Sequence, residues 1–105
     1  CKGYNDTVYP YGNVYDGALC NGDNTQSGTL ASDVSNNCSG AFSDLYNMSG
    51  NVAEWVDECL GSSDCFPKKF YGGHYQSLQS DLLCTSNQSS TDGSPAATIG
   101  IRCCN

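Results

Sequence analysis

The chain has 105 residues, which allows a single domain with one modest hydrophobic core. Its formal net charge is −7 with only four basic residues, so it lacks the clustered Lys and Arg that nucleic-acid binding requires. It contains no apolar run long enough to span a membrane. The excess of carboxylates is compatible with a hard cation such as calcium, although solubility alone explains most of them.

Cysteines supply the cross-links that so small a core needs. They stand at Cys1, Cys20, Cys38, Cys59, Cys65, Cys84, Cys103 and Cys104. An even, dense set in a short chain predicts a disulfide framework, and hence an extracellular or cell-surface protein. The alternative is a zinc cluster, but no Cys-x-x-Cys pair occurs and His74 is the sole histidine. The short separation through Gly61 and Ser62 predicts that Cys59 pairs with Cys65.

In chain order, residues 1–38 are rich in Tyr, Gly and Asn and are predicted to form loops, with one short strand around Val14–Tyr15. The next segment is the most apolar, and we expect it to pack the domain centre. Its members are Phe42, Leu45, Tyr46, Met48, Val52, Trp55 and Val56. A turn over Asn51–Glu54 is predicted to run into a strand around Ala53–Val56.

Three further strands are predicted in the second half. They cover Phe70–Tyr75, interrupted at Gly72–Gly73 by a bulge or close backbone approach, then Leu82–Cys84 and Ile99–Cys103. The Ser-, Gly- and Pro-rich segment Ser86–Pro95 is expected to be a loop. The whole chain, 1–105, is therefore predicted to be one loop-rich domain of short strands.

Several segments resemble one known family when they are taken together. The run from Asp44 to Trp55, DLYNMSGNVAEW, resembles the Y-[DN]-M-x-G-N-V-x-E-W signature of the formylglycine-generating enzymes and their bacterial relatives. Residues 100–103, GIRC, resemble the G-F-R-C that ends the same domain. Residues 71–75 and 82–84 are similar to its R-G-G-S-W and L-R-C strands, and residues 1–3 and 9–13 to its C-R-G and F-P-W-G-N segments. All six segments follow the order of the family.

The resemblance implies an α+β fold, an irregular variant of the C-type-lectin-like fold with bound calcium. It covers only the C-terminal half of the family's longer domain, so the domain is expected to be truncated at its N-terminal side. In the family, the Cys before the Arg-Gly pair is bridged to the Cys of the L-R-C strand, which implies a bond between Cys1 and Cys84. That assignment leaves Cys20 and Cys38 for Cys103 and Cys104, in either order.

The enzymes of this family oxidise a substrate cysteine with two thiols that bind copper(I), and both thiols lie between the Gly-Gly and Arg-Cys strands. Residues 74–83 here contain no cysteine, and Ser77 stands about where one thiol is expected. A hydroxyl cannot replace a soft thiolate for copper(I). We therefore expect no enzymatic activity; the alternative is a copper-dependent oxidase that requires a missing N-terminal half.

The resemblance also implies a calcium site, because Asn47, Gly50, Val52 and Glu54 match the family's ligand positions. An amide oxygen, two backbone carbonyls and a carboxylate form a set of hard donors that suits Ca²⁺. In the alternative, metal-free turn, Asn47 and Glu54 cap backbone groups. Asn21 and Gly22 match the first half of a second family site, whose other half has no clear counterpart.

These features together predict a secreted, noncatalytic, calcium-binding domain with a structural or adhesive role. A half-length domain leaves surface that a neighbour could cover, so we expect a homo-oligomer or filament in an extracellular assembly. The alternative is a carbohydrate-binding module with a glycan ligand. Its aromatic platform would be Tyr4, Tyr9, Tyr11 and Tyr15, and packing or a subunit interface explains these tyrosines equally well.

Overall fold

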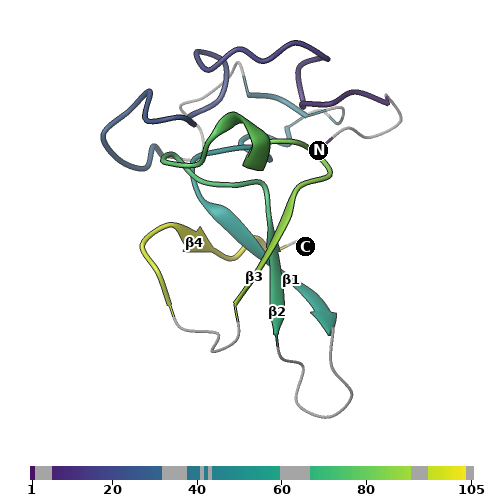
Figure 1. The fold of residues 1–105 in the computed structure, drawn as a ribbon, viewed down its shortest axis with the longest axis vertical. Helices are drawn as coiled ribbons and strands as arrows, with labels where there is room; N and C mark the ends of the chain where they lie inside the picture. Colours follow the sequence, from purple (N-terminus) through teal and green to yellow (C-terminus); the bar gives the residue numbers. More distant parts are fainter. Residues whose placement is uncertain are drawn as a thin grey trace.

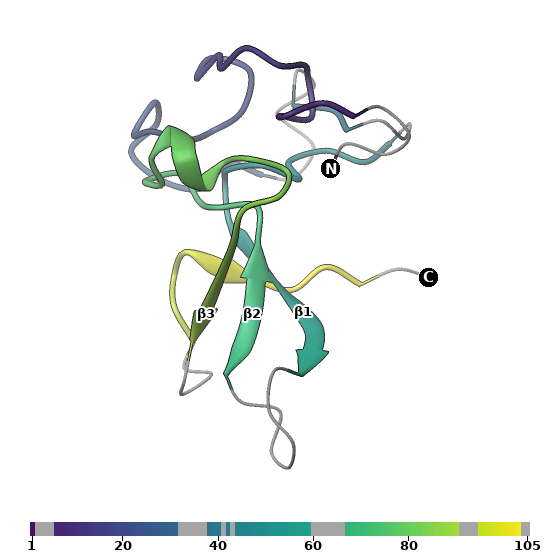
Figure 2. The same ribbon diagram turned by 45° about the vertical axis from the view of Figure 1, so that its right-hand side comes forward.

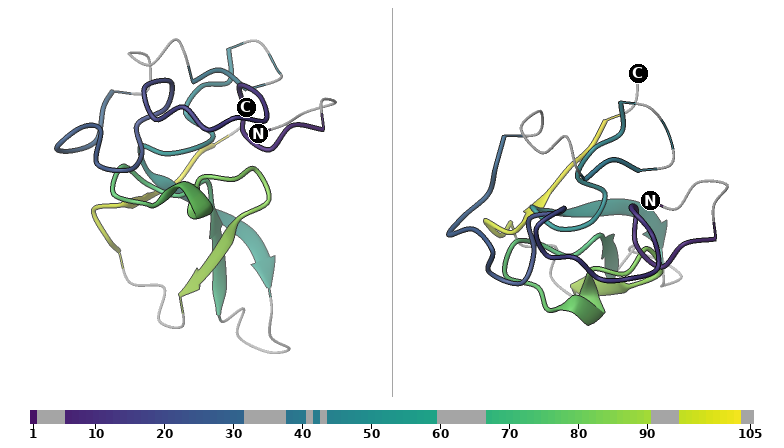
Figure 3. Two further views of the ribbon diagram at one scale, coloured as in Figure 1. Left: turned by 45° about the horizontal axis from the view of Figure 1, so that its top comes forward. Right: turned by 90° about the horizontal axis from the view of Figure 1, so that it is seen from above.

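A four-stranded sheet organises the domain. The computed structural model describes residues 1, 6–31, 38–40, 42, 44–59, 67–90 and 95–103. Its elements are β1 (Ala53–Cys59), β2 (Lys68–Tyr71), the 3-10 helix η1 (Gln79–Asp81), β3 (Asn87–Ser90) and β4 (Ile99–Gly100). The strand order is β3-β2-β1-β4; β1 and β3 run antiparallel to β2, and β4 runs parallel to β1. The N-terminal loops and η1 form a layer above one end of β1, β2 and β3 (Figures 1 and 2), seen from above in Figure 3.

Strand β1 confirms the strand predicted around Ala53–Val56 and extends it to Cys59. Its β-branched and aromatic residues favour a half-buried strand. Trp55 lies opposite Phe70 of β2, with the two rings edge to face at a centroid distance of 5.3 Å. Such a cross-strand aromatic pair stabilises the pairing beyond the area that it buries. The register shifts between Trp55 and Cys59, so the ladder is irregular towards the end of β1.

Other predicted strands differ from the structure. The strand around Val14–Tyr15 does not form, and the Val14 side chain is 80% exposed. Strand β2 ends at Tyr71, because Gly72 and Gly73 take positive φ angles of 92° and 61° that break the extended backbone. The segment Leu82–Cys84 follows η1 as a bend and turn, and the last strand is limited to Ile99–Gly100.

Strand β3 lies inside Ser86–Pro95, which was predicted to be a loop, so that prediction was wrong for Asn87–Ser90. Its sequence, NQSS, has little strand propensity. All four residues nevertheless pair in register with β2, from Lys68 opposite Ser90 to Tyr71 opposite Asn87. The hydrogen-bonding edge of β2 therefore decides the conformation of this polar segment.

The core differs from the apolar stretch that was expected to form it. Phe42 is 48% exposed, and Leu45, Val52 and Trp55 are only half-buried. The buried hydrophobic residues are Tyr9, Cys20, Cys38, Ala53, Phe70 and Leu82. They come from loops and strands far apart in sequence, so the core is assembled by tertiary contacts rather than by one apolar segment.

Two disulfides link the loop layer. Cys1 is bonded to Cys84, as the family resemblance implied, and in the chain-entropy model this long loop contributes about 4–5 kcal/mol. Cys20 is bonded to Cys38, which corrects the expectation that each would pair with Cys103 or Cys104. The structure brings the Cα atoms of Cys20 and Cys38 to 4.8 Å, within the range of a disulfide.

Cys103 is exposed and not part of a disulfide. The predicted Cys59–Cys65 bond involves Cys65, which lies outside the described residues, as does Cys104. Among the residues that are described, helical structure is confined to η1, so the fold is mostly sheet and loop rather than an even mixture of helix and strand. None of these residues forms part of a helix that is long and apolar enough to cross a membrane.

Candidate functional site

The segment from Asn47 to Glu54, which we call the signature turn, connects the loop layer to β1. Its backbone takes positive φ angles of 58° at Asn47, 77° at Gly50 and 64° at Asn51, a region that Asn and Gly tolerate best. The Asn47 N–H donates to the Cys38 carbonyl at 2.9 Å, and the Gly50 N–H donates to the Gly72 carbonyl at 2.6 Å. The turn is therefore held between the Cys20–Cys38 loop and the end of β2.

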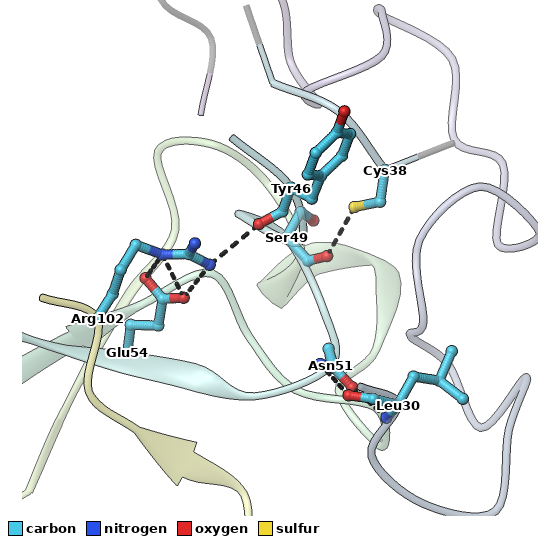
Figure 4. Close-up of polar contacts among 7 residues, drawn as sticks. All are labelled: Leu30, Cys38, Tyr46, Ser49, Asn51, Glu54 and Arg102. Carbon is cyan, nitrogen blue, oxygen red and sulfur yellow. Dashed lines mark hydrogen bonds and ion pairs between the residues drawn. The ribbon is translucent and has the colours of Figure 1, made fainter. Parts of the chain in front are cut away.

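Asn51 anchors the middle of the signature turn, a role that the sequence analysis missed. Its buried side chain accepts hydrogen bonds at Oδ1 from the Leu30 N–H (2.7 Å) and from Asn21 Nδ2 (3.2 Å). Its Nδ2 donates to the Leu30 carbonyl at 3.0 Å (Figure 4). The side chain thus pairs with both backbone groups of Leu30, as a neighbouring backbone would, and connects this distant loop to the turn.

Glu54 at the end of the signature turn is paired with Arg102, which follows β4. The Arg102 Nε donates to both carboxylate oxygens of Glu54, at 2.9 and 3.0 Å, and one terminal nitrogen donates to Oε1 at 2.5 Å. The same nitrogen donates to the Tyr46 carbonyl at 3.0 Å (Figure 4). This pair was not predicted from the sequence, although Arg102 is the sole arginine of the chain.

The signature turn offers donors of the type that calcium prefers. Asn47 is only 4% exposed, Gly50 is buried, and Val52 is half-buried just before β1. The Glu54 side chain retains 16% exposure. An amide oxygen, carbonyls and a carboxylate on one short turn fit a Ca²⁺ ion chemically, while the Glu54 carboxylate is shared with a guanidinium.

The second candidate pair, Asn21 and Gly22, is buried directly beside the signature turn. The Asn51 N–H donates to the Asn21 carbonyl at 2.6 Å, and Asn21 Nδ2 donates to the Gly28 carbonyl at 3.0 Å. The Asn21 Oδ1 is buried and accepts no hydrogen bond within the described part of the chain. At Gly22 a side-chain carbon would overlap Leu82, which explains why glycine stands there. Residues of both candidate calcium sites therefore belong to one hydrogen-bonded unit.

Ser77, which stands where a catalytic thiol is expected, closes a tight turn with His74. Its side chain is 5% exposed, its Oγ accepts from the His74 N–H at 2.9 Å, and its N–H donates to the His74 carbonyl at 2.8 Å. The Ser77 carbonyl accepts from the Asp23 N–H at 2.9 Å. Burial lowers the pKa of His74, and the charge of nearby Asp81 opposes this effect. These contacts give Ser77 a structural role.

No three His, Cys, Asp or Glu side chains come together to hold a metal within the part of the chain that the structure describes. Calcium also accepts amide and carbonyl oxygens, and the signature turn supplies both. The relevant donors are therefore those of Asn47, Gly50, Val52 and Glu54.

The tyrosines of the N-terminal loops pack on one another. Tyr9 is buried and stacks on Tyr11 with a centroid distance of 5.5 Å and an interplanar angle of 6°, and Tyr15 lies 5.6 Å from Tyr9. Burial raises the pKa of both Tyr11 and Tyr15. Tyr4 lies outside the described residues. Tyr9 and Tyr11 therefore turn their ring faces towards each other and Tyr15 packs at a tilt, which is the arrangement of a packed cluster.

The fold and the site define a small, disulfide-linked, loop-rich domain built around a polar turn. Comparison with protein families identifies a match over residues 2–105 to the sulfatase-modifying factor enzyme 1-like domain. The chain therefore belongs to this family, which is the one that its sequence segments resemble. No curated protein and no solved structure matches it significantly.

Proposed function

We propose that this chain is a noncatalytic, calcium-binding member of its family that works outside the cell as a structural or adhesive domain. The observation that carries the proposal is the signature turn. Three positive φ angles and the buried Asn51 side chain hold its backbone in one conformation. Such preorganised oxygen donors stabilise a bound cation without a further ordering cost. The fold that we propose is the irregular C-type-lectin-like fold of the family.

The surroundings of Ser77 support the noncatalytic part of the proposal. A copper(I) oxidase needs two accessible soft thiolates, and residues 74–83 contain none. The Ser77 hydroxyl is buried and used within its own turn. A thiol at this position would have to give up that hydrogen bond before it could bind a metal.

Disulfides and exposed apolar residues support the extracellular and assembly parts of the proposal. Bonds such as Cys1–Cys84 and Cys20–Cys38 persist in oxidising compartments. Val14, Leu78 and Ile101 are well exposed, at 80%, 63% and 78%. We propose that a neighbouring subunit covers these exposed side chains.

Calcium-dependent stability tests the calcium site directly. Because a ligand that binds only the native state stabilises it by mass action, we expect saturating calcium to raise the melting temperature over that in chelator. Glu54→Gln should remove most of this increase. Glu58→Gln, on the same strand and paired with Lys69, is the matched control and should retain it. If the native protein, with its disulfides intact, has the same melting temperature in calcium and in chelator, calcium binding is refuted and the metal-free turn is favoured.

A further inference from the structure

The Arg102–Glu54 pair joins two segments that otherwise share few contacts. Strand β4 has two residues, and its ladder with β1 consists of Ala53 opposite Ile99 and Glu54 opposite Gly100. The Ala53 N–H adds one bond to the Thr98 carbonyl at 2.9 Å. Beyond β4 the chain buries little, since Ile101 is 78% exposed. Arg102 is therefore the main side-chain link between this C-terminal segment and the signature turn.

The Arg102 guanidinium contacts two groups, the Glu54 carboxylate and the Tyr46 carbonyl, and we call this arrangement a two-point clamp. Three donor contacts from one guanidinium reach the two Glu54 oxygens, and a fourth reaches the Tyr46 carbonyl just before the turn. The side chains of Arg102 and Glu54 are only 32% and 16% exposed, so solvent screens this pair less than a surface ion pair. Figure 4 shows the guanidinium lying between the carboxylate and the Tyr46 carbonyl. It thus acts on these oxygens as a bound cation would.

We propose that Arg102 is an internal competitor for the cation of the signature turn, so that the turn binds calcium more tightly when Arg102 leaves Glu54. This inference rests on the calcium binding proposed above. Both oxygens of Glu54 already accept from Arg102, which leaves no unshared bidentate face for a metal. A divalent ion placed beside the guanidinium would also meet like charge. Release of Arg102 detaches the segment after β4, so calcium loading and docking of that segment are antagonistic.

Calcium titration of matched variants measures the competition. Arg102→Gln removes the clamp, and we expect calcium to bind about 5- to 150-fold more tightly, the usual range for coupled sites. Lys69→Gln is the control, because it makes the same change in net charge by removing the Lys69–Glu58 pair (2.7 Å) near the other end of β1. Its calcium affinity should stay that of the native protein. Arg102→Lys keeps the charge but loses the two-point geometry, and should fall between the native protein and Arg102→Gln.

A second measurement needs no variant and therefore does not depend on whether a variant folds. Arg102 is the sole arginine, so one Nε–H signal in a ¹⁵N NMR spectrum reports on the clamp. In chelator this proton should exchange slowly with water, because it is hydrogen-bonded to Glu54. Saturating calcium should make its exchange faster.

The outcomes separate the two proposals. If the native protein and all three variants bind no calcium, both the proposed function and the competition are wrong. If calcium binds but Arg102→Gln is no tighter than Lys69→Gln, or the Nε–H signal keeps its protection, calcium binding stands and the competition is overturned. Tighter binding by Arg102→Gln together with faster Nε–H exchange supports the competition.

Discussion

Asn51 shows how a single side chain sets the position of the candidate site. It has a φ of 64°, and its amide makes three hydrogen bonds that connect the signature turn to Leu30 and Asn21. Leaving buried donors and acceptors without partners costs far more than a hydrogen bond adds, so this residue holds both loops in place. Asn51 therefore stabilises the turn in two ways, through the hydrogen bonds of its amide group and through the tolerance of Asn for positive φ.

Replacing Asn51 separates these two contributions. Asn51→Ala loses the three hydrogen bonds and also places an ordinary side chain at positive φ, and we expect the free energy of unfolding to fall by roughly 3–5 kcal/mol. Asn51→Gly loses the same bonds but accepts the backbone angle, so it should be about 1 kcal/mol more stable than Asn51→Ala. Urea denaturation of both variants measures the difference. Equal stability of Asn51→Gly and the native protein would show that the amide contributes nothing.

At the scale of elements, close backbone approach determines where the strands begin and end. Gly72 and Gly73 end β2, and Gly50, three residues before β1, lies against the backbone of Asn21. A side-chain carbon at Gly50 would overlap the Asn21 carbonyl oxygen, and the residue has a φ of 77°. The loop layer can therefore pack on the turn only if this position is glycine.

Gly50→Ala tests this packing. We expect it to lower the free energy of unfolding by about 2–4 kcal/mol, because steric overlap with backbone and an unfavourable φ act together. Gly28→Ala is the control, since nothing lies within 4 Å of a carbon added there and its φ is not positive. That variant should change stability by no more than about 0.5 kcal/mol. If thermal unfolding gives the same loss of stability for Gly50→Ala and Gly28→Ala, the structure around Gly50 is contradicted.

At the scale of the whole molecule, one edge of the sheet is a candidate surface for association. In the part of the chain that the structure describes, β3 is the outermost strand on one side, and its four residues carry no charge. Natural proteins usually protect such edges with charged residues, proline or a cover. We expect this uncharged edge, together with exposed residues such as Ile101, to favour contact with another copy of the chain.

Sedimentation of the native, disulfide-bonded protein examines this expectation. At micromolar concentration with calcium present, we expect a species larger than the 11.1 kDa monomer. Ser89→Lys places a charge on the exposed face of β3 and should shift the protein towards monomer, whereas Ser80→Lys in η1 should not. A native protein that sediments as a monomer would argue against the assembly and leave a monomeric binding domain.

The local sequence alone was sufficient for several features. The ordered set of segments that includes DLYNMSGNVAEW indicated the family, and the family resemblance implied the Cys1–Cys84 bond. The adjacent Trp55 and Val56, which favour a strand, predicted β1. These features depend on residues close together in the chain or on motifs in a constant order, which a single sequence displays directly.

Only the tertiary structure decided the rest. Strand β3 exists because β2 offers it a hydrogen-bonding edge, and its own residues gave no strand pattern. The Cys20–Cys38 bond depends on a distance of 4.8 Å between Cα atoms, which cysteine spacing does not predict. Glu54 and Arg102 are 48 residues apart and meet only because β4 pairs with β1. Pairing between distant segments depends on the packing of the whole chain. The free energy that favours one pairing over another is a sum over many contacts, so no single segment determines it.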